Sequence, residues 1–144
     1  MILVADTSGL ICSYDLDDPD SDRASAVLDR AALVVASPIV FAEIEHVLTR
    51  NAGRVAANAV LDSLLAAERS LRLAIPEITS DMLRAARAVQ TRYADLALDL
   101  ADGVNTVLAA EYQTDAILTL DRRDFRAIRP LTAHKAFRVL PDDH

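Results

Sequence analysis

Three short, almost entirely apolar runs constrain the fold of this chain more than any other feature of its sequence. They span residues 1–5, 33–36 and 116–120, and each contains β-branched side chains. Apolar runs of this length are typical of strands that are buried on both faces of a parallel sheet. Segments with helical spacing of apolar residues separate the runs, and residues 71–75 suggest a further short strand. The sequence therefore predicts an α/β fold, namely an α/β/α sandwich with helices on both faces of a mostly parallel sheet of four or five strands.

Acidic residues follow these strands at the end where open parallel sheets bind ligands. Asp6 comes directly after the first run and Asp121 directly after the third. Glu43 lies about one and a half turns into the helix predicted after the second run, and Asp102 begins the helical pattern that precedes the third. Because the carboxyl ends of parallel strands meet at one edge of a sheet, we expect these four carboxylates to lie close together.

Each of these acids also has a structural interpretation. A carboxylate at the start of a helix caps free N–H groups and suits the positive end of the helix dipole, and an acid after an apolar strand can be a solvated turn residue. Four carboxylates brought together, however, repel one another unless a cation lies among them, and oxygen ligands suit Mg²⁺ or Mn²⁺. The sequence therefore predicts a site for one or two divalent ions, which would activate water and stabilise a phosphoryl transition state.

Four sequence blocks carry a family resemblance: VADTSGL, SPIVFAEIEHVL, LDLADGVNTVLAAEY and ILTLDRRDF, in this order. Together they resemble the PIN-domain ribonucleases of the VapC toxin type, and the resemblance extends over essentially the whole chain, as far as FRVLP. It implies a PIN-like fold and a metal-dependent endoribonuclease that uses Mg²⁺ or Mn²⁺. By this resemblance, Asp6, Glu43, Asp102 and Asp121 match the four catalytic acids that hold the metal. Asp6 and Asp102 would be the principal ligands, and the other two would complete the site directly or through water.

Five further residues are expected to support these acids. Thr7, Ser8 and Thr119 match the small hydroxyl positions that orient the acids in the family, and Asp99 and Asp124 are additional acids nearby. All five are therefore predicted to surround the metal without being its principal ligands.

The chain departs from the family pattern at two places. The fourth acid varies within the family, so Asp124 is an alternative to Asp121 as a ligand. Gly103 follows Asp102, where such proteins more often carry alanine.

The resemblance also implies a biological setting. The protein would be the toxin of a type II toxin–antitoxin pair, cutting a structured RNA such as tRNA or ribosomal RNA and leaving a 5′-phosphate and a 3′-hydroxyl. A cognate VapB-like antitoxin would wrap the helical arm predicted over residues 38–50 and 55–69, and it would insert a basic or bulky side chain into the acidic site. A homodimer is expected as well.

The overall charge argues against a simple nucleic-acid binder, because the formal net charge is −7 and the isoelectric point is about 4.8. Five arginines and one lysine nevertheless lie between residues 122 and 140, together with a single acid, Asp124. We predict that Arg122, Arg123 and Arg126, which follow Asp121 closely, contact RNA phosphates. A solvated arginine face is the alternative interpretation.

The length of 144 residues suffices for one domain. We predict a single PIN-like nuclease domain over residues 1–140, followed by a short polar tail at residues 141–144. No apolar run approaches the roughly 20 residues that a membrane span requires, so no membrane association is expected. The only cysteine, Cys12, cannot form an internal disulfide, which fits a reducing compartment and predicts a cytoplasmic protein.

Three other functions compete with this interpretation. A receiver-like signalling domain that binds Mg²⁺ needs two adjacent acids after its first strand and a late lysine, whereas Thr7 follows Asp6 and the sole lysine is Lys135, beyond the last block. A phosphatase of the haloacid dehalogenase type needs an Asp-x-Asp motif, in which Ser8 takes the place of the second acid. A PIN fold kept as a non-catalytic RNA-binding or assembly module is the third alternative, and the intact acids argue against it.

Overall fold

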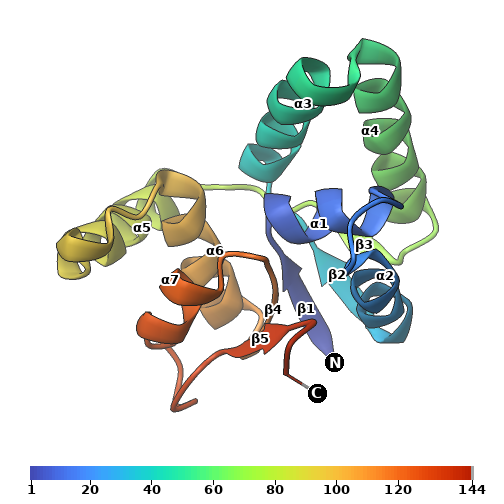
Figure 1. Cartoon of the computed structure of the whole chain (residues 1–144). Coiled ribbons are helices and arrows are strands. Elements are labelled where there is room, and N and C mark those ends of the chain that lie inside the picture. Colours follow the sequence, from blue (N-terminus) through green and yellow to red (C-terminus); the bar gives the residue numbers. More distant parts are fainter. Residues whose placement is uncertain (144) are drawn as a thin grey trace.

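The computed structural model describes residues 1–143, and a five-stranded sheet in the order β3-β2-β1-β4-β5 forms its centre (Figure 1). The strands are β1 (Ile2–Ala5), β2 (Leu33–Val35), β3 (Leu73–Ala74), β4 (Ala116–Leu118) and β5 (Arg138–Leu140). All four strand pairs are parallel. The predicted α/β fold is therefore confirmed. The strand order differs from the 2-1-3-4-5 order of receiver domains, which argues against that alternative.

Helices cover both faces of the sheet. They are α1 (Thr7–Tyr14), α2 (Ser21–Arg30), α3 (Pro38–Ala52), α4 (Arg54–Arg69), α5 (Ser80–Arg92), the short 3₁₀ helix η1 (Ala94–Leu96), α6 (Leu100–Glu111) and α7 (Arg122–Ala127). Helices α1 to α4 pack on one face and α5 to α7 on the other, and α3 and α4 form a hairpin that extends from the sheet (Figure 1). Within residues 1–143, no helix is long and apolar enough to cross a membrane.

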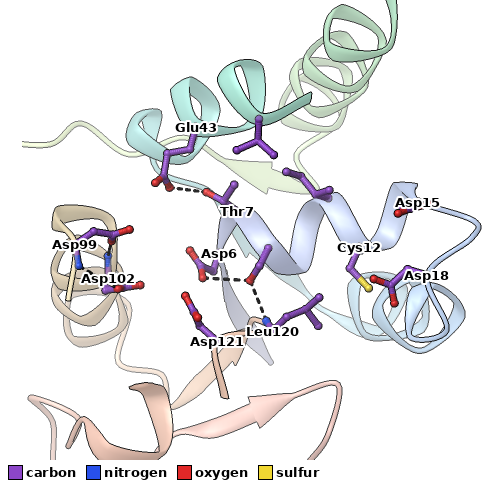
Figure 2. A pocket seen from close by; sticks show the side chains of 13 residues that line it. Asp6, Thr7, Cys12, Asp15, Asp18, Glu43, Asp99, Asp102, Leu120 and Asp121 are labelled. Carbon is purple, nitrogen blue, oxygen red and sulfur yellow. Dashed lines mark hydrogen bonds between the residues drawn. The ribbon is translucent and has the colours of Figure 1, made fainter. Parts of the chain in front are cut away.

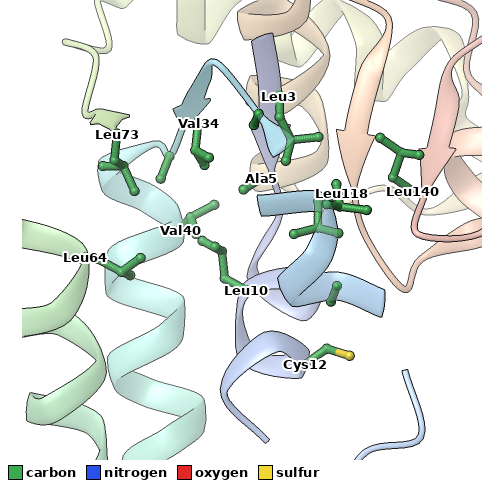
Figure 3. Packing of buried hydrophobic residues seen from close by; sticks show 14 of the residues in the cluster. Leu3, Ala5, Leu10, Cys12, Val34, Val40, Leu64, Leu73, Leu118 and Leu140 are labelled. Carbon is green, nitrogen blue, oxygen red and sulfur yellow. The ribbon is translucent and has the colours of Figure 1, made fainter. Parts of the chain in front are cut away.

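The central strand β1 is buried on both faces, as predicted. Leu3, Val4 and Ala5 have no exposed surface. Leu3 and Ala5 belong to the hydrophobic cluster beneath α1 to α4, which Figure 3 shows, whereas Val4 belongs to the cluster beneath α5 to α7. This division follows from the alternation of side chains along a strand. Burial of a side chain the size of Leu3 or Val4 contributes about 1.5–3 kcal/mol to folding, so β1 anchors Asp6, the residue that follows it.

Hydrogen bonds align the carboxyl ends of three strands. The Asp6 N–H donates to the carbonyl oxygen of Leu118 at 2.9 Å, and the Thr119 N–H donates to the carbonyl oxygen of Leu140 at 3.0 Å. These bonds continue the β1–β4 and β4–β5 ladders by one step. The first residues of the chain therefore meet residues near 118 and 140 at one edge of the sheet.

The strand β4 ends at Leu118, whereas the sequence predicted a strand that continues to residue 120. The Leu120 N–H donates to Ser8 Oγ at 2.9 Å, and the Asp121 N–H donates to Thr119 Oγ1, also at 2.9 Å. Side-chain hydroxyls thus take the place of a neighbouring strand as hydrogen-bond acceptors. As a result the chain turns away from the sheet, and Asp121 lies in the turn that precedes α7.

A close approach of two helices explains the glycine at position 103. A Cβ atom on Gly103 of α6 would lie 2.6 Å from the carbonyl oxygen of Ala86 in α5. Such a distance is far below van der Waals contact, so alanine would push the two helices apart. The departure from the family pattern therefore reflects how tightly α5 packs against the first turn of α6.

The described part of the predicted polar tail, residues 141–143, is held against the domain. Pro141 is buried, Asp142 pairs with Arg122, and Asp143 pairs with Arg126. The Asp143 N–H also donates to the carbonyl oxygen of Val139 at 2.9 Å. Residue 144 lies outside the described residues.

Candidate active site

Three carboxylates from distant parts of the chain meet at the carboxyl edge of the sheet. Asp6, Asp102 and Asp121 each place one oxygen within 4.8 Å of the others. Asp6 follows β1, Asp102 lies in the first turn of α6, and Asp121 precedes α7 (Figure 2). Asp6 and Asp102 are only 4% and 5% exposed, whereas Asp121 faces solvent. The cluster is therefore open on one side and enclosed on the other.

Three side chains orient the Asp6 carboxylate. Asn105 Nδ2 donates to Oδ1 at 3.1 Å, Thr119 Oγ1 donates to Oδ2 at 2.9 Å, and Ser8 Oγ donates to Oδ2 at 3.4 Å. Burial raises the pKa of Asp6 to about 6, against the lowering effect of the Thr119 hydrogen bond and with a further rise from the charge of Asp121. The carboxylate is thus held in place while its negative charge remains poorly solvated.

Asp102 is fixed by a reciprocal pair of hydrogen bonds with Asp99. The Asp102 N–H donates to Asp99 Oδ1 at 2.9 Å, and the Asp99 N–H donates to Asp102 Oδ2 at 3.3 Å. This capping box makes Asp99, and not Asp102, the N-cap of α6. Burial first, and then the charges of Asp99, Asp6 and Asp121, raise the pKa of Asp102 to about 8.

Asp121 is the acid of the fourth sequence block that reaches the cluster. Its pKa is raised by partial burial and by the charges of Asp124 and Asp99. Asp124 lies in the first turn of α7 and does not belong to the three-acid group. The geometry therefore favours Asp121 over Asp124, the two alternatives that the sequence left open.

Glu43 lies on the wall of the same cavity. It belongs to α3, which begins at Pro38 after the N-cap residue Ser37. Thr7 Oγ1 donates to Glu43 Oε1 at 2.6 Å, so the start of α1 holds this side chain. The cavity has a volume of about 330 Å³ and is lined by Glu43 together with the three clustered aspartates. Glu43 does not, however, join the group whose oxygens lie within 4.8 Å of one another.

The small hydroxyl residues hold the acids and the turn together. Thr119 is fully buried, donates to Asp6 and accepts the N–H of Asp121. Ser8 contacts both Asp6 and Thr119, and it accepts the N–H of Leu120. One short network thus links the first acid of the cluster to the turn that carries the last.

Asn105 is a site residue that the sequence analysis missed. It is fully buried in α6, and among residues 1–143 its Oδ1 atom has no hydrogen-bond partner. Its amide nitrogen contacts Asp6. Asn105 follows Asp102 by three residues, so both lie on one side of the helix. A polar amide on the side of a helix that carries an acid, within an otherwise apolar segment, is the signal that could have identified it.

The raised pKa values of the three aspartates result from burial and from repulsion between their charges. Buried carboxylates that repel one another bind protons more tightly than isolated ones. A divalent cation between them would offset both the burial and the repulsion, and carboxylate oxygens are the ligands that hard ions such as Mg²⁺ prefer. The donor set therefore fits a metal site.

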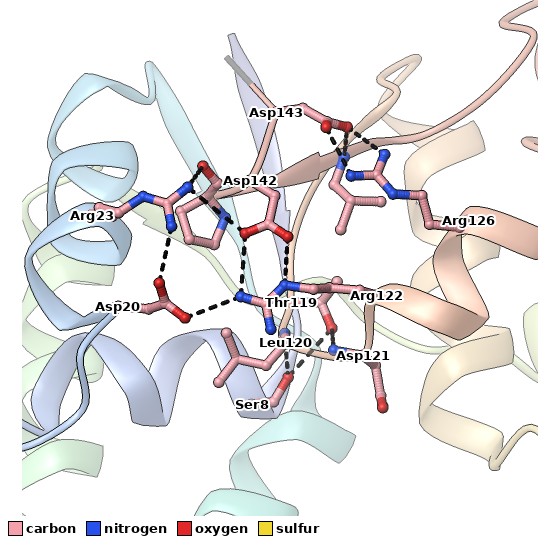
Figure 4. Close-up of polar contacts among 12 residues, drawn as sticks. Ser8, Asp20, Arg23, Thr119, Leu120, Asp121, Arg122, Arg126, Asp142 and Asp143 are labelled. Carbon is pink, nitrogen blue, oxygen red and sulfur yellow. Dashed lines mark hydrogen bonds and ion pairs between the residues drawn. The ribbon is translucent and has the colours of Figure 1, made fainter.

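Two of the three arginines predicted to contact RNA are engaged by carboxylates (Figure 4). Arg122 donates through Nε and Nη2 to Asp142 and through Nη2 to Asp20, and these partners raise its pKa. Arg126 donates to both carboxylate oxygens of Asp143, at 2.7 and 2.8 Å. Arg123 is exposed and makes no ion pair with the rest of residues 1–143.

Comparison with known proteins places this geometry among related folds. The sequence profile of the PIN domain matches residues 3–130. Ribonuclease VapC26 of Mycobacterium tuberculosis is 37% identical over 144 residues, which cover 96% of this chain and 100% of that protein.

Two solved structures show the same fold at low sequence identity. VapC20 of Mycobacterium tuberculosis, described as a sarcin–ricin loop cleaving toxin, has a TM-score of 0.71 and 19% identity, covering 83% of this chain and 90% of that one. VapBC2 of Rickettsia felis, bound to a DNA fragment from its promoter, has a TM-score of 0.68 and 15% identity, covering 96% of this chain and 98% of that one.

Proposed function

The chain belongs to the PIN-domain family and is a ribonuclease of the VapC toxin type, and from this premise we propose that it hydrolyses RNA phosphodiester bonds at Asp6, Asp102 and Asp121. The observation that carries the proposal is the meeting of these three carboxylates within 4.8 Å. Their raised pKa values and their open face suit a cation that must also contact a substrate.

The ion we propose is Mg²⁺ or Mn²⁺. Asp6, Asp102 and Asp121 would hold it, and Glu43 would complete the site directly or through water. When bound, the ion would supply Lewis-acid activation of water and stabilisation of the charge that develops on the phosphoryl group.

The side chains around the ligands have distinct roles in this proposal. Asn105 and Thr119 orient Asp6, the Asp99 N–H orients Asp102, and Thr7 orients Glu43. No side chain acts as the nucleophile. Water attacks in line with the leaving 3′ oxygen, which leaves a 5′-phosphate and a 3′-hydroxyl.

The substrate and partners that we propose follow the relatives. VapC20 is named as a toxin that cleaves the sarcin–ricin loop, and we propose a structured RNA, tRNA or ribosomal RNA, as the substrate here. A toxin–antitoxin complex from Klebsiella pneumoniae shares the fold, and we propose a VapB-like antitoxin that covers the α3–α4 hairpin and inserts a basic side chain into the acidic cavity. We further propose a homodimer that acts in the cytoplasm.

Cleavage of total bacterial RNA tests the proposed function. The purified protein is incubated with the RNA in Mg²⁺ or Mn²⁺, and new 5′ ends are mapped. We expect a few discrete cuts that disappear with EDTA or in the Asp6→Asn variant and persist in Asp17→Asn, which removes an exposed loop acid. RNA binding without cleavage in every metal would instead support the non-catalytic module, and cleavage by Asp6→Asn would remove this residue from the site.

A further inference from the structure

The two ion-paired arginines belong to α7, the helix that follows the last acid of the cluster. Arg122 directly follows Asp121, and Arg126 comes four residues later, on the same side of the helix. An RNA strand that extends from the cluster along α7 would reach both guanidinium groups. The cavity itself offers such a strand little attraction, because Asp15, Asp18 and Asp99 line it in addition to the proposed ligands.

Each of these guanidinium groups grips a carboxylate with two nitrogens, and the two carboxylates are consecutive in the chain. Arg126 holds Asp143 through Nη1 and Nη2, and Arg122 holds Asp142 through Nε and Nη2 (Figure 4). Arginine binds phosphate with the same two-pronged geometry that it uses for carboxylate. The tail acids thus occupy the positions that two phosphates of an RNA backbone would take.

The contacts that hold the tail acids are accessible to solvent. The side chains of Arg122 and Arg126 are 38% and 47% exposed, and those of Asp142 and Asp143 are 30% and 32% exposed. Because solvent reaches both partners, a phosphate that takes the place of a carboxylate can restore the same two-nitrogen contact to the arginine. Arg122 would keep its second partner, Asp20, during such an exchange.

The backbone of the tail is held independently of the arginines of α7. The Asp143 N–H and the Val139 carbonyl oxygen form one hydrogen bond, and the Val139 N–H donates to Asp143 Oδ2 at 2.8 Å. Arg23 also donates to the carbonyl oxygen of Pro141. In Asp143→Asn the amide oxygen can accept the Val139 N–H in place of the carboxylate, so neutral variants of the tail acids are expected to leave the path of the chain intact.

We propose that Arg122 and Arg126 form a docking surface for two RNA phosphates, and that Asp142 and Asp143 cover this surface in the free protein. The proposal rests on the proposed RNA substrate. It assigns the C-terminal acids a role as internal competitors of RNA, which sets how tightly the nuclease binds its substrate.

RNA affinity measured in the absence of cleavage tests this proposal. The probe is a fluorescein-labelled RNA hairpin, and the protein carries Asp102→Asn so that it does not cut. Adding Asp142→Asn and Asp143→Asn together is expected to tighten binding about tenfold at low salt. Two additional phosphate contacts would also steepen the slope of log Kd against log salt concentration by about 1.5.

A charge-matched control separates docking from general electrostatics. Asp62→Asn and Glu68→Gln remove two negative charges from exposed positions on α4, the hairpin helix far from α7 (Figure 1). We expect this pair to change the salt slope by far less than the tail pair. Equal effects of the two pairs, or no effect of the tail pair, would overturn the proposal.

The arginines themselves provide the second measurement. Arg122→Gln with Arg126→Gln is expected to weaken binding strongly when the tail acids are asparagine and only slightly when they are aspartate. Thermal unfolding of each variant checks that the fold is kept. Equal losses in both backgrounds would mean that the tail does not compete with RNA.

Failure of the proposed function remains distinguishable from failure of this inference. With Asp102 restored, the tail pair is expected to raise kcat/KM for RNA cleavage and leave kcat unchanged. Tighter, arginine-dependent RNA binding without any cleavage would sink the nuclease assignment of the site but support the docking surface. RNA cleavage together with unchanged RNA binding would support the nuclease assignment and overturn the docking surface.

Discussion

At the scale of single residues, the burial of Asn105 lowers the stability of the fold. Its Nδ2 atom donates to Asp6, while its Oδ1 atom is buried without a partner among residues 1–143. A buried carbonyl left unpaired costs about 1–3 kcal/mol. An apolar side chain would avoid this cost, so the value of Asn105 lies in its contact with Asp6.

We expect Asn105→Ala to weaken Mn²⁺ binding by about 10- to 100-fold, the usual effect of losing a group that orients a ligand. The measurement is the shift of the thermal midpoint as Mn²⁺ is titrated, with cleavage rates in parallel. Asn105→Ser, which keeps a small donor, should recover part of the affinity. A Mn²⁺ titration identical to that of the unmodified protein would show that Asn105 serves packing alone.

The raised pKa values of Asp6 and Asp102 predict a pH dependence of stability without metal. Their values in the folded protein are about 6 and about 8, against 3.8 for an ordinary aspartate. Above pH 3.8 the unfolded chain loses these protons first, so the free energy of unfolding falls as the pH rises towards 8. Asp102→Asn should reduce this fall and unfold at a higher temperature than the unmodified protein at pH 8. Chemical denaturation in EDTA at several pH values from about 4 to about 8 measures this free energy. A free energy of unfolding that rises with pH would contradict the prediction.

At the scale of helices and strands, the packing of α6 against α5 sets the position of Asp102. The carbonyl oxygen of Ala86 leaves no room for a side chain at Gly103. A methyl group there must move α6 away from α5 or tilt its first turn. Because Asp102 lies in that turn, a packing change becomes a change in the distance between carboxylates.

Gly103→Ala is therefore expected to destabilise the protein by about 1–3 kcal/mol through overpacking and to weaken metal binding as well. Chemical denaturation gives the first quantity and a Mn²⁺ titration the second. A variant with unchanged stability and unchanged Mn²⁺ affinity would show that the two helices separate without cost.

Apolar patterns predicted four of the five strands and the layered α/β fold, because burial of apolar faces determines those features, but they did not assign β5 or α7. The same patterns placed the end of β4 at residue 120, whereas the strand ends at Leu118. The difference arises from the hydroxyls of Ser8 and Thr119, which accept backbone N–H groups across the site. Ser8 lies far from β4 in sequence, so no local pattern could reveal that contact.

The site was predictable to the extent that it depends on strand ends. Asp6, Glu43, Asp102 and Asp121 were predicted to meet because the carboxyl ends of parallel strands share an edge. The structure brings Asp6, Asp102 and Asp121 together and leaves Glu43 on the wall of the cavity. The orientation of Asn105 and the ion pairs of Arg122 depend on tertiary contacts with Asp6 and Asp142. Contacts of that kind leave no periodic signal in the sequence.

At the scale of the whole molecule, the proposed metal site would couple metal binding to folding. The three proposed ligands follow β1, lie in α6 and precede α7, so the unfolded chain does not hold them together. An ion that binds only the folded state stabilises it by about 2.7 kcal/mol when its concentration is 100 times Kd.

We therefore expect Mn²⁺ at about 100 times its Kd to raise the free energy of unfolding by about 2.7 kcal/mol, and EDTA to reverse the change. Scanning calorimetry of the unmodified protein and of Asp6→Asn provides the measurement. Asp17→Asn serves as the control and should respond to Mn²⁺ as the unmodified protein does. An equal response in Asp6→Asn would place the ion elsewhere.

The pairing of β1 with β4 has a consequence for synthesis of the protein. Asp6 emerges first from a ribosome, but Thr119, which orients it, and Asp121, which completes the cluster, emerge only after most of the chain has been translated. A partly made chain therefore holds an incomplete set of these carboxylates. The acid cluster forms only once residue 121 is free to fold back beside β1, so the three carboxylates come together only late in the synthesis of the chain.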